Sequence, residues 1–358
     1  MSLFAQVADA SVNPALGVMI FVLGGLAGAV FYLPFKRVKN WAWESYWMIY
    51  AVFGLIVVPW VLALSTSPNV VSVLMAAPGK VLGYCFLCGA MWGVGGLTWG
   101  LMIRYLGVGL GLAIGCGLCS AAGTIIPPII KGEFAQLLET NAGLVSLGGV
   151  LVSLVGIILV GGAGMSKENE LPDEVKKATV AEYNFKLGLF VAIFSGLMSA
   201  AMNFGLQGGG TIETLALTTK PFTSETWKGI PVLVVVLLGG FVVNGAWCLF
   251  LNAKNRTLGD YTKSGTPLLA NLIFAGLAGA IWCSQFICLK TGEPAMGPLK
   301  YIGWSVMFSG AILFSTVLGI GLGEWRNTSS RTRLLLAIGL LFLVLSSVIS
   351  GYSGYLKQ

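Results

Sequence analysis

The chain has 358 residues, of which 56% are hydrophobic and 10% are charged, and its mean hydropathy is +0.86. A soluble globular protein of this length would lack the polar surface it needs, so the composition excludes that class and indicates a membrane protein. The net charge of +7 does not indicate a nucleic-acid partner, because no soluble basic domain accompanies it.

Charge-free apolar runs recur along the whole chain. A membrane-spanning helix needs roughly 20 mostly apolar residues. The positions of glycine and proline divide the runs into ten such segments. We therefore expect an all-α polytopic membrane protein with ten transmembrane helices. The predicted spans are residues 14–34, 43–64, 81–103, 107–128, 144–163, 187–207, 230–251, 267–289, 300–322 and 334–355.

The loops between these spans alternate in positive charge. Loops on one side hold 14 Lys and Arg residues and those on the other side hold seven. Short loops rich in Lys and Arg stay in the cytoplasm, so both termini are predicted on the outer side of a plasma (inner) membrane. The seven outer cations in this prediction are Lys80, Lys131, Lys220, Lys228, Lys290, Lys300 and Lys357.

One long polar segment, residues 164–186, divides the spans into five and five. The predicted domains are a first five-helix repeat (1–165), a cytoplasmic linker (166–186) and a second repeat (187–358). Because each half crosses the membrane an odd number of times, halves of the same fold must be inverted relative to each other, as in many secondary transporters. GAMW (89–92) matches GAIW (279–282), and GGLAGAVFYL (24–33) aligns with SGLMSAAMNF (195–204). The alternative is a membrane scaffold or enzyme with incidental symmetry.

Four cysteines, Cys85, Cys88, Cys116 and Cys119, form two CxxC pairs. Such pairs can bind zinc, but both lie inside predicted spans, where cysteine usually packs as a small apolar residue. We therefore expect neither a metal nor another cofactor.

The polar residues inside the predicted spans are neutral, and no Asp, Glu, Lys or Arg lies near the middle of any span. Charged cargo usually requires buried charge, whereas an uncharged polyol requires amides and hydroxyls for its rim and an indole for its C–H face. The candidate substrate-binding residues are Tyr32, Trp92, Thr98, Trp99, Asn203, Gln207, Trp282, Gln285 and Trp304. For any of them the alternative is an interfacial aromatic belt or an amide that joins two helices.

Two carboxylates at span ends are candidates for proton coupling. Glu44 lies in the first turn of the second span among three tryptophans, and Glu324 ends the ninth. The helix N-terminus favours ionised Glu44 while the indoles desolvate it, although a plain salt bridge to Lys36 or Lys39 is an equally simple reading. The chain has no histidine, so a proton must be carried by a carboxyl group, an unusual lysine such as Lys290, or water.

Several motifs together resemble one known family. FYLPFKRVKNWAWESYW, GAMWGVGG followed by GLMIRYLG, AAMNFG, WCSQF and GEWRN are similar in order and spacing to the L-rhamnose:proton symporter family of the drug/metabolite transporter superfamily. The resemblance implies a ten-helix inverted-repeat importer of L-rhamnose, with L-lyxose as a second candidate, driven by protons. The matching residues are Tyr32, Glu44, Trp92, Asn203, Trp282, Gln285 and Glu324. Gly96 and Thr98 stand where the family pattern would have asparagine, and the ninth span lacks an expected histidine.

The sequence thus predicts a secondary active transporter for a neutral deoxy-sugar, working by alternating access in the lipid bilayer. The alternative within transport is an exporter of amino acids or other small metabolites, which should need a buried carboxylate for a cationic or zwitterionic cargo. A membrane enzyme would need an acid pair, an activated nucleophile or a metal-ligand set at membrane depth, and none is evident. A pore would show continuous polar stripes, whereas the polar residues cluster near the span centres.

Overall fold

The computed structural model describes residues 13–356 except 107, 171–183, 264, 322 and 324. Every regular element among the described residues is a helix. The elements are α1 (Pro14–Val30), η2 (Pro34–Arg37), α2 (Trp43–Val52), η3 (Phe53–Val57), α3 (Val58–Thr66), α4 (Val70–Ala76), α5 (Gly79–Leu106), α6 (Val108–Ile130), α7 (Phe134–Glu139), α8 (Asn141–Asn169), α10 (Phe185–Gly208), α11 (Gly210–Thr218), α12 (Ile230–Asn255), η4 (Leu258–Tyr261), α13 (Leu268–Met296), η5 (Gly297–Ile302), α14 (Gly303–Gly321) and α15 (Ser330–Ser353).

Side-chain caps fix where several long helices begin. The side-chain oxygens of Asn13, Thr140, Asn184 and Ser329 each accept a hydrogen bond from a backbone N–H in the first turn of α1, α8, α10 and α15. Such a cap satisfies one of the N–H groups that a helix start leaves without a partner. The start of these helices is therefore encoded locally in the sequence.

Helices overlap each predicted span, although α8 and α13 continue six and seven residues beyond the predicted ends, and the second span is built from α2, the π-helical turn η3 and α3. By length and composition, eight helical stretches among the described residues qualify as candidate membrane spans. One of these stretches, Leu268–Gly321, contains both α13 and α14. Helix α6 is not among the eight and qualifies only as a shorter apolar helix, Ile114–Ile130. The chain is therefore an all-α, multi-pass membrane protein. Of the predicted linker 166–186, residues 166–169 belong to α8, and residues 171–183 lie outside the described residues.

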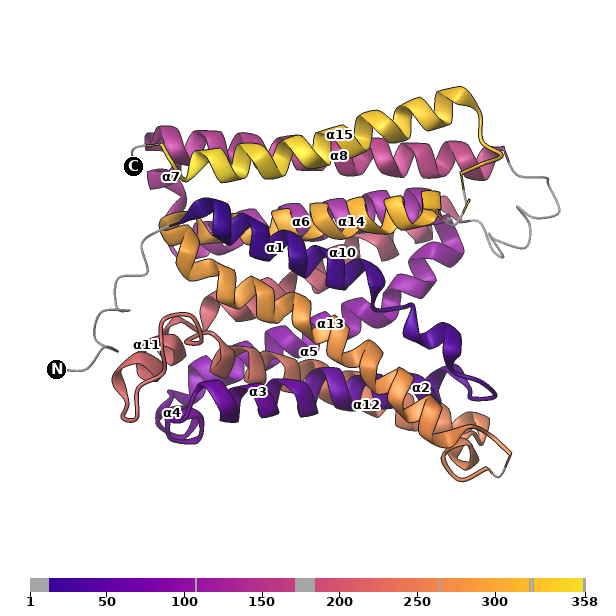
Figure 1. The fold of residues 1–358 in the computed structure, drawn as a ribbon, viewed down its shortest axis with the longest axis horizontal. Helices are drawn as coiled ribbons and strands as arrows, with labels where there is room; N and C mark the ends of the chain where they lie inside the picture. The colour runs from indigo at the N-terminus through magenta and orange to yellow at the C-terminus, as the bar shows by residue number, and fades with distance from the viewer. Residues whose placement is uncertain are drawn as a thin grey trace.

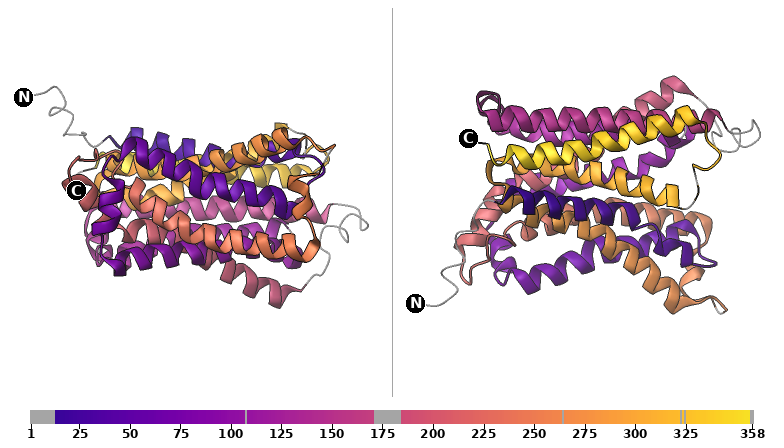
Figure 2. Two further views of the ribbon diagram at one scale, coloured as in Figure 1. Left: turned by 90° about the horizontal axis from the view of Figure 1, so that it is seen from below. Right: turned by 45° about the horizontal axis from the view of Figure 1, so that its top comes forward.

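The helices form a bundle in which they run between two ends (Figure 1). We call one the terminus end, because α1 begins and α15 ends there, with Gly354 packed against Pro14. The short helices α4, α7 and α11 lie at this end (Figure 1). The opposite end, where α8 ends and α10 begins, is the linker end. Figure 2 shows the same helices from below and with the top turned forward.

A few pairings dominate the bundle. Helix α10 packs along α5 and α6, α1 packs along α13 and α14, α5 packs on α12, and α13 packs on α2 and η3. Helices α8 and α15 pair with each other and lie side by side along one edge (Figure 1). Two crossings are so close that only glycine fits: a Cβ on Gly89 would overlap the carbonyl oxygen of Val236, and one on Gly279 would overlap that of Tyr50. Small residues allow this approach where lipid removes the hydrophobic drive between helices.

Candidate functional site

Two tryptophans from opposite halves of the chain meet in the interior of the bundle. The rings of Trp92 on α5 and Trp282 on α13 stack with centroids 5.0 Å apart and planes 28° apart. Trp282 is only 6% exposed and also contacts Tyr50 edge-on and Phe286. Offset stacking of this kind is a favoured geometry of aromatic pairs. Both residues were predicted to line the site, and the structure brings them into direct contact.

Trp304 and Asn203 attach to the same stretch of α6. The indole Nε1 of Trp304 donates to the carbonyl oxygen of Cys119 at 3.1 Å, and the amide of Asn203 donates to that of Gly123 at 2.6 Å, one helical turn further. Trp304 is 2% exposed and lies beside Phe286, so it is no interfacial belt residue. The Oδ1 atom of Asn203 is buried and has no hydrogen-bond partner among the described residues. An unpaired buried acceptor is costly, so a ligand hydroxyl there would be stabilising.

Gln285 lies one turn after Trp282 on α13 and is 9% exposed. Its amide nitrogen donates to the carbonyl oxygen of Trp282 at 3.0 Å. Its Oε1 faces α1 at Gly28, where an added Cβ would lie 2.9 Å from that oxygen. The side chain therefore points between α13 and α1 and not to lipid, and its Oε1 can accept a further hydrogen bond.

Thr98 and Trp99 belong to the contact between α5 and α10. The hydroxyls of Thr98 and Ser195 lie 2.6 Å apart, and the indole of Trp99 donates to Ser199 at 2.8 Å. Both side chains therefore join α5 to α10.

Tyr32 and Glu44 lie toward the linker end, apart from the stacked tryptophans. Tyr32 is 55% exposed and contacts the rings of Phe35 and Trp47. Glu44 is 5% exposed.

The Glu44 carboxylate accepts hydrogen bonds of 2.9 Å from the side chains of both Asn255 and Thr257. No ion pair between described residues joins Glu44 to Lys36 or Lys39. The other carboxyl candidate, Glu324, lies outside the described residues.

A buried charged cluster that the sequence did not predict lies at the terminus end. It consists of Glu213 of α11, Lys290 and Glu293 of α13, and Gln207 of α10. Lys290 Nζ lies 2.6 Å from Glu213 Oε1 and 2.5 Å from Glu293 Oε2. Gln207 Nε2 donates to Glu293 Oε1 at 2.7 Å. We call these four residues the ionic cluster.

The prediction that Lys290 is a loop cation is wrong. Helix α13 continues to Met296, and Lys290 is 2% exposed. The physical reason is that Lys290 is neutralised by a carboxylate one turn later on its own helix and by a second one 77 residues away in sequence. The i, i+3 spacing of Lys290 and Glu293 is the one signal in the sequence that could have suggested the pair.

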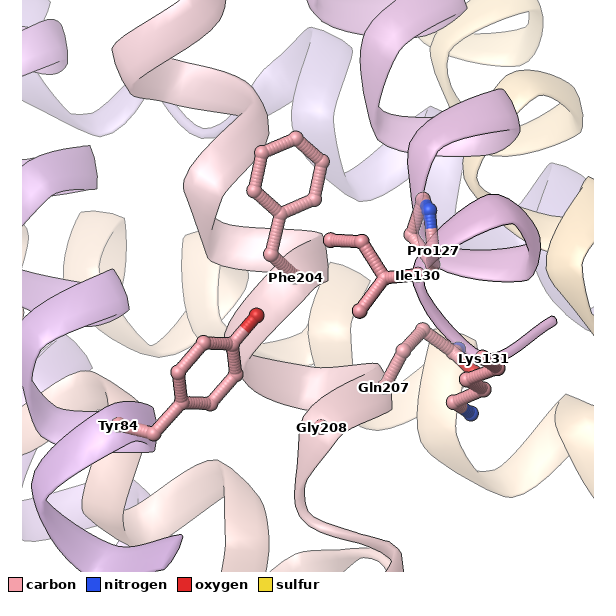
Figure 3. Close-up of a pocket in the computed structure, with 7 residues that line it drawn as sticks. All are labelled: Tyr84, Pro127, Ile130, Lys131, Phe204, Gln207 and Gly208. Carbon is pink, nitrogen blue, oxygen red and sulfur yellow. The ribbon is translucent and has the colours of Figure 1, made fainter. Parts of the chain in front are cut away.

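Gln207 also lines a pocket of about 120 Å³ among α5, α6 and α10 (Figure 3). The Tyr84 hydroxyl points into this pocket, toward Phe204 (Figure 3). Sites for small molecules commonly measure about 300–1,000 Å³. The pocket is therefore too small to be a complete sugar site. Its other lining residues are Pro127, Ile130, Lys131 and Gly208.

The cysteine pairs form no metal site in the part of the chain that the structure describes. Cys85, Cys88 and Cys119 are buried free thiols, and no group of three or more His, Cys, Asp or Glu side chains there could hold a metal ion.

Comparison with known proteins identifies the family. Residues 10–354 match the family described as L-rhamnose-proton symport protein (RhaT). Proteins named L-rhamnose-proton symporter from Klebsiella pneumoniae subsp. pneumoniae, Citrobacter koseri and Escherichia coli are each 31% identical over 340 residues, which are 94% of this chain and 97% of theirs. Their names describe transporters and not enzymes. The resemblance stated from the motifs is thus confirmed, and the chain belongs to the L-rhamnose-proton symport protein family.

Proposed function

We propose that this protein imports L-rhamnose together with a proton across the inner (plasma) membrane, with L-lyxose as a second substrate. The observation that carries the proposal is the family match over residues 10–354 combined with the buried, uncharged set of indoles and amides around Trp282. A 6-deoxy sugar has both hydroxyl and methyl patches, and such a set offers partners to both. Trp92, Asn203, Trp282, Gln285 and Trp304 are the proposed sugar-binding residues.

The remaining candidates keep more limited roles in this proposal. Thr98 and Trp99 join α5 to α10, Gln207 belongs to the ionic cluster, and Tyr32 lies near the linker end. Glu44 and Glu324 stay predictions as residues that take part in proton coupling.

We further propose ten transmembrane helices arranged as two inverted five-helix repeats that move by alternating access. The support is that corresponding helices of the two halves have corresponding neighbours. Helix α5 of the first half packs on α10 and α12 of the second half, and its counterpart α13 packs on α1 and α2 of the first half. The aligned glycines behave alike, since Gly25 packs α1 on α14 and Gly196 packs α10 on α6. The matched tryptophans of GAMW and GAIW stack on each other. With Lys- and Arg-rich loops in the cytoplasm, the terminus end faces outward.

The test is uptake of labelled L-rhamnose into proteoliposomes with and without an inward proton gradient. For one proton per sugar, a gradient of one pH unit can sustain about tenfold accumulation. Uptake that ignores the gradient contradicts symport. Absence of uptake for both L-rhamnose and L-lyxose contradicts the substrate class, and gradient-driven efflux of an amino acid would favour the exporter.

A further inference from the structure

The ionic cluster carries an inference about how the proton is coupled, and this inference rests on the proposed function. Its two carboxylates and one ammonium leave one negative charge in excess. Lys290 is 2%, Glu293 4% and Glu213 8% exposed, so this excess charge lies away from water. Unbalanced buried charge is strongly unfavourable. Binding of one proton makes the cluster neutral, and loss of that proton restores the charge.

Other titratable and charged groups surround the cluster without cancelling this excess within it. Cys85 of α5 is buried nearby as a thiol. Lys300 of η5, Lys131 after α6 and Lys228 before α12 are near enough to interact electrostatically with the cluster. Lys131 is exposed and Lys228 and Lys300 are half-buried, so water screens part of their charge. The backbone of Gly229, at the start of α12, packs directly against the Lys290 side chain.

The two carboxylates differ in position. Glu213 lines a hollow of about 650 Å³ at the terminus end, together with Thr211, Thr214, Lys228 and Lys300. Its side chain is 11% exposed, compared with 4% for that of Glu293. Glu293 lies deeper, on the same helix as Trp282 and Gln285. The cluster therefore shares Glu213 with the hollow at the terminus end, and it shares helices α10 and α13 with several of the proposed sugar-binding residues.

Gln207 provides the link to the sugar. It lies one turn after Asn203 on α10 and holds Glu293 Oε1 at 2.7 Å. A hydrogen bond to an ionised carboxylate is roughly twice as strong as one between neutral groups. A proton on Glu293 weakens this bond and frees the Gln207 amide, whereas ionised Glu293 draws the amide back.

We propose that Glu293 carries the co-transported proton, that Glu213 is the fixed counter-charge of Lys290, and that Gln207 transmits the protonation state to the sugar site. The proton is taken from water at the outer side by a carboxylate oxygen of Glu293. It leaves the same oxygen for water on the inner side after the halves reorient. No other bond forms or breaks.

The decisive variant is Glu293→Gln, which is isosteric with the protonated side chain and leaves Lys290 and Glu213 as a neutral pair. Two assays in proteoliposomes separate its roles: counterflow of L-rhamnose without a gradient, and accumulation under an inward gradient of one pH unit. We expect E293Q to exchange L-rhamnose but to lose the accumulation, which is about tenfold for one proton per sugar. Glu225→Gln is the matched control, because Glu225 forms an exposed pair with Lys228 on the same side, and it should accumulate like the wild type.

A second variant tests the division of roles. In Glu213→Gln the cluster has lost its excess negative charge, so Glu293 should take up its proton only at lower pH. The pH dependence of accumulation should shift toward acid without being abolished. An unshifted profile contradicts the role of Glu213.

Two outcomes overturn the assignment of Glu293. The first is E293Q accumulating L-rhamnose like the wild type. The second is E293Q losing counterflow together with accumulation, since the residue then holds the structure and does not move a proton. Failure of the proposed function would look different, because wild-type liposomes themselves would then show no L-rhamnose counterflow.

Discussion

At the scale of single residues, the stacked tryptophans limit where a sugar can bind. Trp92 and Trp282 cover one face of each other's ring. The six-membered ring of Trp92 also lies against Gly240, where a Cβ would come 2.5 Å from its Cζ3 atom. In the proposed site, a sugar that stacks on the faces that the two indoles share must first separate the pair.

Asn203 gives the sharpest prediction at this scale. Its Oδ1 is buried without a partner, so we expect it to accept a hydrogen bond from a sugar hydroxyl. One such bond is worth about 0.5–1.5 kcal/mol, so Asn203→Ala should raise the KM for L-rhamnose by about two- to tenfold. Initial uptake rates over a range of sugar concentrations measure this.

The control is Asn184→Ala, which removes an exposed amide from the start of the same helix. Loss of this cap costs about 1 kcal/mol of stability but should leave the KM unchanged. An equal KM for wild type and N203A would remove Asn203 from the site.

At the scale of helices, the fold depends on a few glycine crossings. Gly89 and Gly279 occupy matching positions in GAMW and GAIW, and each lets a backbone carbonyl of the neighbouring helix approach where no Cβ fits. Both crossings join a helix that carries a stacked tryptophan to its neighbour. The position of each indole is therefore fixed by a glycine three residues earlier.

Alanine at either glycine should destabilise the protein. Overpacking in a close-packed interior costs about 1–3 kcal/mol, so Gly89→Ala and Gly279→Ala should both lower the midpoint of thermal unfolding in detergent. Gly83→Ala is the control on α5, because a Cβ there meets nothing within 4 Å. Gly83→Ala should keep or raise the midpoint, since alanine favours a helix over glycine. A midpoint for G89A equal to that of wild type would contradict the close crossing.

A carboxylate joins α8 to α15 at the linker end. Glu170 accepts hydrogen bonds from the Thr332 hydroxyl and from the hydroxyl and backbone N–H of Ser329, at 2.5–2.7 Å. These bonds, that from Thr332 most of all, hold the pKa of Glu170 below its ordinary value. Because the folded pKa is lowered, the stabilisation is present above the unfolded pKa and is lost as the pH falls through the folded pKa.

Glu170→Gln should therefore lower the thermal midpoint slightly at neutral pH, and the difference from wild type should vanish in acid. Melting curves of both proteins across a pH series measure it. Glu139→Gln, at an exposed position on α7, is the control that should show no such pH-dependent difference. A constant difference between E170Q and wild type at all pH values would mean that the carboxylate charge plays no part.

At the scale of the whole molecule, the two ends of the bundle differ in what holds them together. The ionic cluster ties α10, α11 and α13 at the terminus end. At the linker end, carboxylates accept hydrogen bonds from uncharged donors, as where Asp260 accepts from the Ser45 hydroxyl and from the backbone N–H of Ala42.

The sequence by itself determined the membrane class, the family and the approximate positions of the long helices, with α8 and α13 extending furthest beyond their predicted ends. These follow from properties that are local in the chain: apolar runs, helix caps such as Asn184, and contiguous motifs. It also identified Trp92 and Trp282 as candidate site residues, because an indole N–H in the middle of an apolar helix needs a hydrogen-bond partner or a polar cavity. It missed the ionic cluster, because hydropathy treated Lys290 as the end of a span.

Only the tertiary structure decided which polar residues meet. Whether Lys290 can be buried depends on Glu213, which lies on another helix far along the chain, and whether Trp99 serves a ligand or a helix contact depends on Ser199. The cost of burying a polar or charged group is set by its partner in space, and one-dimensional patterns do not contain that partner. The composition therefore determined that the protein lies in a lipid bilayer, while the packing of the helices determined where charged side chains can be buried.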